Sequence, residues 1–470
     1  WRYRTTKLLQ RYRRGFVAAA AVLTVTLGMA TFYTGKLATE RDRARRGEAK
    51  AEQVATFLTS LFALADPDQS RGADITAREI LERGSRRIRT DLADQPEIQA
   101  AMLDVVGEVY HGLGLYDESR ELLARALALK ADLYGDQHLE YAASARLLGQ
   151  LDTVTGRLAA ADSLFSRVVA IRRAELGQQH LAVAEALQGQ AMVAVYQGRP
   201  EAAESLYHEA LAIYAQRTLQ RHPPYATCLN DLALLLLERG DTGSAEPMFR
   251  EALALQRAWL GEDHPEVANT LYNLGLLLRE RGDWEAAEPI QRQVLALDRQ
   301  LYGDHHPNVA YSLMGLGALL DEQGNQAEAE RAYAEAYAMR SDLLPPGHPE
   351  IIKSLSSLSL VRNKQGRYAE AEAGLREAVT LTREHLGEKH QLLAGRLNDL
   401  GWLLHDTGRY EEAIALHRES LALNLELRGP DHKYTAIAHM HLARSLGELG
   451  QFQEALTHQR RALAIARERY

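Results

Sequence analysis

The feature that most constrains this chain is a 42-residue period that runs through most of its length. One histidine recurs eight times and one glycine nine times at that spacing, without a single insertion. The histidines are His138, His180, His222, His264, His306, His348, His390 and His432, and the glycines are Gly114, Gly156, Gly198, Gly240, Gly282, Gly324, Gly366, Gly408 and Gly450. Periods of roughly 20–50 residues are typical of solenoids, in which each unit packs only against its neighbours. We therefore expect a one-dimensional stack, not the roughly three compact domains that the length alone suggests.

The columns around each glycine indicate what one unit is. Apolar residues 15, 11, 8 and 4 positions before the glycine lie on one helical face, and alanine stands five positions after it in eight of nine units. Seven positions before it, small residues predict a close helix crossing: Gly107, Gly149, Ala191, Ala233, Gly275, Gly317, Ser359, Gly401 and Ala443. Each unit is therefore predicted to be a helix, a left-handed glycine turn and a second helix, at about 265–281 and 284–300 in the clearest case.

The periodic histidine belongs to the start of each unit. In Asp263-His264-Pro265-Glu266, we expect Asp or His to cap the first helix, Pro to occupy its first turn and Glu to close a capping box. A metal role is disfavoured, because successive histidines are held one unit apart and do not converge on an ion. The single cysteine, Cys228, falls in a column of small residues and is interpreted as a buried, inert thiol.

The N-terminal part is organised differently. Between Arg14 and Lys36 lie 21 residues without a charge, which is long enough to span a bilayer, and a cleaved signal peptide is the alternative. Six basic residues lie on each side, so charge barely decides the orientation. The predicted organisation is a basic juxtamembrane segment (1–14), a transmembrane helix (15–35), a charged helical stalk (36–56), a degenerate first repeat or cap (57–95) and the repeat solenoid (96–470).

Charge and motifs exclude several functions. Residues 1–50 carry a net charge of +9 and the remainder −17, and an acidic array is a poor nucleic-acid binder. The chain lacks a Gly-rich phosphate loop, an HRD-type catalytic loop, a DFG metal site, HExxH and GxSxG. We therefore predict no catalytic site, no cofactor and no metal.

Two family resemblances follow from these residues. The segment 397–423 followed by RGPDHKYTA resembles tetratricopeptide repeats, and the 42-residue period with LGEDHPEVA is similar to the long variant in kinesin light chains, over about 95–470. This resemblance implies an all-α, right-handed superhelical solenoid of about nine to ten antiparallel helix pairs. Residues 51–84 resemble the region that follows the catalytic domain and membrane helix of bacterial membrane-spanning serine/threonine protein kinases, although no kinase lies in this chain. The second resemblance implies a single-pass protein of the bacterial inner membrane, with the repeats outside the cytoplasm.

One face of the first helices varies from unit to unit. Positions 13, 9, 6 and 2 before the glycine lie on one side of that helix, and in the fold that the chain resembles the first helices line the concave surface. From this face we predict seven partner-binding residues: Asn269, Asn273, Tyr311, Lys353, Asp399, Trp402 and His441. The predicted function is a membrane-anchored scaffold that binds peptides or proteins in the concave groove and contacts lipid through residues 15–35. The alternatives are the regulatory half of a receptor kinase and a spacer with an unused, solvated groove, and self-association stays open.

Overall fold

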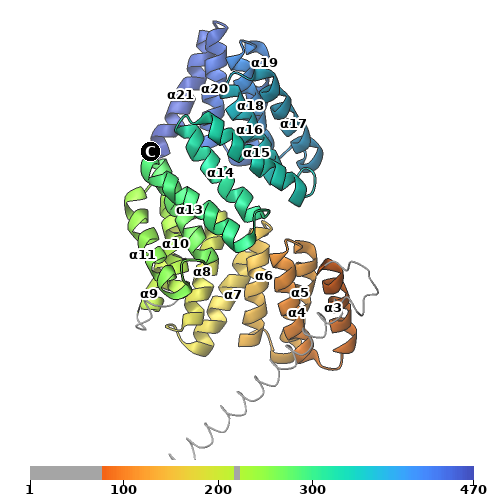
Figure 1. Cartoon of the computed structure of the whole chain (residues 1–470). Coiled ribbons are helices and arrows are strands. Elements are labelled where there is room, and N and C mark those ends of the chain that lie inside the picture. The colour runs from red at the N-terminus through yellow and green to blue at the C-terminus, as the bar shows by residue number, and fades with distance from the viewer. Residues whose placement is uncertain (1–76, 216–222, 470) are drawn as a thin grey trace, which may run out of the picture. The chain divides into compact units, whose positions relative to one another are not determined.

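A computed structural model describes residues 77–215 and 223–469, and within these ranges the chain forms nineteen α-helices and no strand (Figure 1). The packing divides the chain into two compact units, with the boundary between Ile213 and Tyr214. The first unit contains α3 (Ala77–Asp91), α4 (Pro96–Gly112), α5 (Tyr116–Tyr134), α6 (Leu139–Val154), α7 (Leu158–Leu176), α8 (Leu181–Tyr196) and α9 (Pro200–Ala215, which extends two residues past the boundary). Helices of the predicted solenoid, 96–470, occur in both units.

The second unit contains the remaining helices. They are α10 (Pro223–Glu238), α11 (Thr242–Leu260), α12 (Pro265–Glu280), α13 (Trp284–Tyr302), α14 (Pro307–Glu322), α15 (Gln326–Leu343), α16 (Pro349–Lys364), α17 (Tyr368–Leu386), α18 (Gln391–Asp406), α19 (Tyr410–Arg428), α20 (Lys433–Glu448) and α21 (Phe452–Arg469). Even-numbered helices are the first helices of the repeats and odd-numbered ones the second helices. Consecutive helices pack on one another from α3 to α8 and from α10 to α21, and first helices also contact one another, as α10 and α12 do. First helices thus share one side of the stack.

Glycine turns end the first helices and most of the second helices; α15, with Leu344 as its C-cap, is an exception. The predicted left-handed turn is confirmed where it is described: Gly282, for example, has φ +75° between α12 and α13. A second glycine series with positive φ ends the second helices and was not predicted from the sequence. It comprises Gly135, Gly177, Gly261, Gly303, Gly387 and Gly429. Because this backbone conformation is costly for other residues, both series fix where the helices end.

The periodic histidines cap the first helices, as predicted. His264 Nδ1 accepts a hydrogen bond from the backbone N–H of Glu266 at 3.1 Å, and six more histidines make the same bond: His138, His180, His306, His348, His390 and His432. His222 lies outside the described residues. The predicted capping box is wrong, because the N-cap is His264 and not Asp263. Glu266 is therefore the second helical residue, one position short of where a capping box requires it.

The small column is steric, as predicted. A Cβ added at Gly317 would lie 2.8 Å from Tyr333 Cε1, and one at Gly401 would lie 2.6 Å from His417 Cε1. Both neighbours stand on the second helix of the same repeat, sixteen residues further on. The predicted apolar face is likewise buried, with Val267 and Leu271 at 0% and 2% exposure. These two columns hold each helix pair together, since burial of large aliphatic and aromatic side chains is the main stabilising contribution.

The predicted N-terminal segments are only partly described. The helix α3 lies in the predicted cap and packs on α4, which begins at Pro96 as the predicted solenoid does. Residues 1–76 lie outside the described residues, and with them the predicted span at 15–35 and stalk at 36–56. Of the helices in 77–215 and 223–469, none is both long enough and apolar enough to cross a membrane.

Candidate functional site

The predicted partner-binding face lies on first helices of the second unit, and its residues differ in exposure. Asn269 on α12, Tyr311 on α14 and Lys353 on α16 are exposed, with 52% of Tyr311 accessible. Lys353 Nζ pairs with Glu350 Oε1 at 2.7 Å on the same helix. These three side chains stand on rigid helices and are available to a partner, because surface ion pairs such as that of Lys353 are weak.

Asn273 does not belong to the exposed part of this face. It is 6% exposed, and its Nδ2 donates to Asn230 Oδ1 at 3.0 Å on the neighbouring first helix α10. The prediction of Asn273 as a surface anchor is corrected accordingly. A buried amide needs a hydrogen-bond partner within the protein, and the side-chain amide of Asn230 supplies it. Asn273 therefore joins adjacent first helices.

Tyr311 and Asn269 border a pocket between consecutive repeats. The ring of Tyr311 lies 4.7 Å from that of Tyr272, measured between centroids. The pocket of about 430 Å³ lies between the N-terminal halves of α12 and α14 and the C-terminal half of α13, and the buried carboxylate of Asp298 forms part of its wall. Burial is the main cause that raises the pKa of both Tyr272 and Asp298. The pocket thus combines aromatic faces, amides and a carboxylate at one step of the stack.

The other three predicted residues lie near the C-terminal end of the unit. Trp402 on α18 is half-buried against His441 on α20, with ring centroids 5.9 Å apart and an edge-on geometry. His441 in turn contacts His417 on α19 at 5.7 Å. Asp399 is half-buried beside Arg396, at 3.2 Å, and burial raises its pKa. The structure therefore brings Trp402 and His441 together, away from the pocket that Tyr311 borders.

His417 was not predicted, and its surroundings are unusual. The ring is 1% exposed and Nδ1 is buried without a hydrogen-bond partner. Burial, and secondarily His441, lower the pKa of His417 to about 3. The sequence signal was present, because position 417 is the counterpart of Tyr333 and faces Gly401 across the close crossing.

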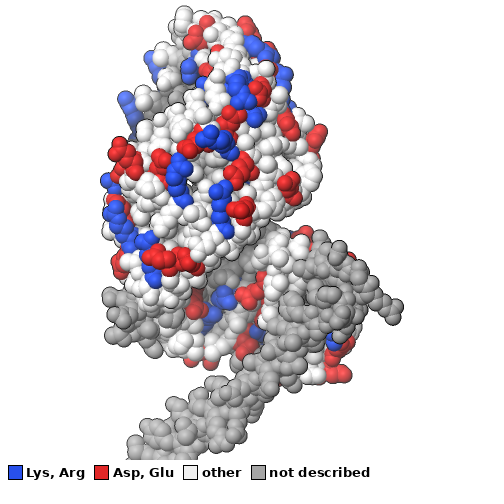
Figure 2. Space-filling view, in the orientation of Figure 1, with Lys and Arg blue, Asp and Glu red and all other residues white. Residues whose placement is uncertain are grey.

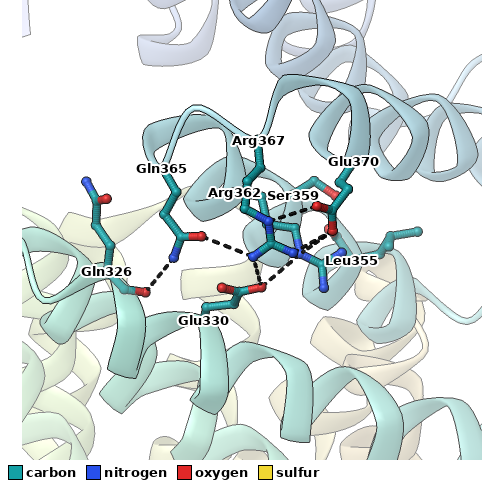
Figure 3. Close-up of polar contacts among 8 residues, drawn as sticks. All are labelled: Gln326, Glu330, Leu355, Ser359, Arg362, Gln365, Arg367 and Glu370. Carbon is teal, nitrogen blue, oxygen red and sulfur yellow. Dashed lines mark hydrogen bonds and ion pairs between the residues drawn. The ribbon is translucent and has the colours of Figure 1, made fainter.

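Ion pairs join successive repeats at their turns. Arg367, which follows the turn glycine Gly366, reaches Glu330 of the preceding repeat at 2.7 Å, and Arg362 reaches the same carboxylate at 3.0 Å (Figure 3). Burial alone would raise the pKa of Glu330, but the two guanidinium groups lower it. Figure 2 shows basic and acidic side chains next to one another across the visible face, with no large area of one sign. The ion pairs among these charges join one repeat to the next.

Among the residues that the structure describes, no group of three or more His, Cys, Asp or Glu is arranged to hold a metal ion. Cys228 is fully buried, and burial raises the pKa of its thiol, as expected for an unreactive packing residue. No catalytic domain is evident in the described ranges. The class that the fold defines is an all-α repeat protein built from stacked helix pairs.

The sequence assigns this chain to a family. The tetratricopeptide repeat model matches residues 98–174, 153–216, 196–258, 225–300, 266–342, 350–426 and 403–468. These matches together span well over half of the 470 residues, so the chain belongs to the tetratricopeptide repeat family, as the sequence predicted. No curated protein matches it.

Two solved structures with a TM-score above 0.5 agree on the fold. The chain is similar to the apo quorum sensor NprR from B. thuringiensis, with 14% identity and a TM-score of 0.54, over 77% of this chain and all of that one. It is similar to a Rap protein complexed with Competence and Sporulation Factor, with 15% identity and a TM-score of 0.53, over 79% of this chain and 99% of that one. A putative kinesin light chain with nearly identical TPR-like repeats from P. anserina has 21% identity and a TM-score of 0.39, over 44% and 98%.

Proposed function

We propose that this chain is a protein-interaction scaffold that binds peptides or partner proteins on the face of its first helices. The observation that carries the proposal is a contrast between columns: packing positions such as Leu271 repeat nearly the same buried residue, whereas the positions of Asn269, Tyr311 and Lys353 vary and are exposed. Exposed aromatic and amide groups on rigid helices are frequent anchors of recognition. The Rap protein of similar fold, which is complexed with Competence and Sporulation Factor, is in keeping with this use.

The experiment compares two first-helix variants with an outer-face control. Tyr311→Ala and Lys353→Ala each remove one exposed side chain, and Arg331→Ala on α15 removes a side chain that is 74% exposed. After circular dichroism shows that all three proteins are folded, each is used to capture partners from host lysate, with quantitative mass spectrometry. A common set of partners should be lost from both first-helix variants and kept by Arg331→Ala. Unchanged partner sets, or equal losses from the control, would refute the proposal.

We further propose that residues 15–35 anchor the scaffold in the bacterial inner membrane and that the repeats lie outside the cytoplasm. The support is the uncharged run of 21 residues between basic flanks, together with the resemblance of residues 51–84 to the segment beyond the membrane helix of bacterial kinases. Protease added to intact spheroplasts should then digest the repeats and spare residues 1–14. Protection of the repeats until lysis would reverse the orientation, and a mature N-terminus near Ala30 would replace the anchor by a cleaved signal.

A second candidate function is favoured by the same segment. Residues 51–84 resemble the region between kinase domain and repeats in bacterial receptor kinases, so the chain would be the sensor or regulatory C-terminal half of such an enzyme. Its test is the coding sequence upstream of Trp1. An HRD-type loop and a DFG motif there would support the regulatory function, and an open reading frame without them would exclude it.

A further inference from the structure

A buried polar position recurs at the junction between repeats. It stands sixteen residues after the turn glycine, on the second helix. Its buried occupants include Lys130, Arg172, Gln256, Asp298, Arg340, Thr382 and Asn424. Three of these seven carry a positive charge, and Asp298 is the one acid among them.

Where this position is basic, groups on first helices bind the cation, either on the next repeat alone or on its own repeat and the next one. Arg340 donates to Ser354 Oγ at 2.7 Å and to the Glu350 carbonyl at 3.1 Å, and it pairs with the Glu350 carboxylate at 2.7 Å. Lys130 pairs with Asp104 at 2.8 Å and with Glu140 at 3.2 Å. A buried charge is stable only with such partners, so the junctions at Lys130 and Arg340 hold a cation within the protein.

At the junction of α13 and α14 this position is occupied by an acid. Asp298 occupies the position of Arg340, and its Oδ2 accepts a hydrogen bond from Ser312, the counterpart of Ser354. The described pocket of about 430 Å³ opens at this junction, and Asp298 and Ser312 both line it. A carboxylate replaces the internal cation, and the cavity beside it is large enough for the end of a side chain.

The chemistry of the pocket favours a cation as ligand. Tyr272, Tyr302 and Tyr311 contribute aromatic groups, Glu266 and Asp298 contribute carboxylates, and no Lys, Arg or His lines the cavity. Aromatic faces and carboxylates both attract guanidinium groups.

An anion would find fewer partners there. The N-terminal ends of α12 and α14 border the pocket, but their second-residue N–H groups, at Glu266 and Asn308, already donate to His264 and His306. Outside the lining, the ring of His306 stacks on that of Tyr302, with centroids 4.4 Å apart, and Arg340 is already bound by Glu350 and Ser354.

We propose that this pocket binds the guanidinium group of an arginine side chain on the partner, in the place that Arg340 fills at the following junction. The inference deepens the proposed partner-binding function and rests on it. Asp298 would pair with the guanidinium, the tyrosine rings would contact its stem and plane, and the exposed amide of Asn269 would be free for the backbone of the ligand.

The test uses a small probe and does not need the native partner. Binding of N-acetyl-arginine N-methylamide to the full 470-residue chain is measured by saturation-transfer NMR, with the uncharged citrulline analogue as the comparison. We expect roughly tenfold tighter binding of the arginine compound, as one charge-assisted pair provides. Asp298→Arg should abolish this preference by supplying the internal cation, and Asp298→Asn should weaken it without adding bulk. Asp342→Arg, an exposed site on α15, is the matched control and should bind as the wild type does.

Three outcomes would overturn the inference: no binding of the arginine compound to the wild type, equal binding of the citrulline compound, or unchanged binding by both Asp298 variants. Circular dichroism on each variant separates lost binding from lost folding. None of these outcomes decides the lysate experiment with Tyr311→Ala and Lys353→Ala. A negative result for arginine binding can therefore be told apart from a negative result for the scaffold function.

Discussion

The steric role of the small column can be tested with one substitution made at two positions. At Gly317 the added methyl carbon of alanine would lie 2.8 and 2.9 Å from Tyr333 Cε1 and Cδ1, closer than carbon atoms pack. Tyr333 is 5% exposed and cannot move aside without displacing α15. At Gly395, inside α18, the same methyl would meet no atom within 4 Å.

The two variants should therefore change stability in opposite directions. Overpacking at a close crossing costs about 1–3 kcal/mol, so Gly317→Ala should lower the free energy of unfolding by that amount. Gly395→Ala should raise it by about 0.5–1 kcal/mol, because alanine is the better helix former and loses less backbone entropy. Gly275→Ala should fall between them, since its obstacle is the flexible end of Gln291.

The assay is urea denaturation followed by circular dichroism at 222 nm, with the shift of the transition in the second unit compared across the three variants. A wild-type midpoint for Gly317→Ala would refute the assigned crossing of α14 and α15. Equal destabilisation by Gly317→Ala and Gly395→Ala would show that any side chain in a first helix is harmful, and the steric explanation would then be wrong.

Two more predictions concern histidines. Burial holds the pKa of His417 at about 3, below its ordinary 6.5, so the unfolded chain binds a proton that the folded chain excludes. Stability should fall as the pH drops from 6.5 toward 3, by about 2 kcal/mol at pH 5, and His417→Gln should remove this loss in thermal melts at pH 5 and 8. An identical pH dependence in the variant would contradict the assignment. His306→Ala should lower the free energy of unfolding by about 1 kcal/mol and His306→Asn by less, because asparagine also caps, whereas zinc or a chelator should leave the melting temperature unchanged. A reproducible stabilisation by stoichiometric zinc would show that the histidines bind metal.

Much of the local structure could be predicted from columns of the repeat. The end of α12 was predicted at about 281 and lies at Glu280. The sequence also predicted the left-handed turn at Gly282 and an N-cap at Asp263 or His264, and His264 is the cap. These features depend on residues within one helix pair, and the period displays each of them many times. The capping box failed because Asp263 and His264 can both cap, and the choice between them moves Glu266 by one position.

Features that depend on how one repeat meets the next were missed. The sequence placed Asn273 on the open face, yet Asn230 on the adjacent first helix buries it. It also gave no sign of the buried polar position that Arg340 and Asp298 share, since its seven buried occupants are of six residue types and do not form a visible column. Periodicity reports what all repeats have in common. A binding site arises where one repeat carries a residue that the other repeats lack, as at Asp298.

Site-specific photocrosslinking tests the central claim most directly, because it reports which face a partner touches in the cell. The photoreactive residue p-benzoylphenylalanine would replace Tyr311 or Lys353 on the first helices, and Arg331 or Asp342 on the outer face of α15 as controls. The proposed scaffold predicts the same crosslinked partner from positions 311 and 353 and none from 331 and 342. Crosslinks from the outer positions alone, or none from the first helices under conditions in which the chain is folded and expressed, would contradict it.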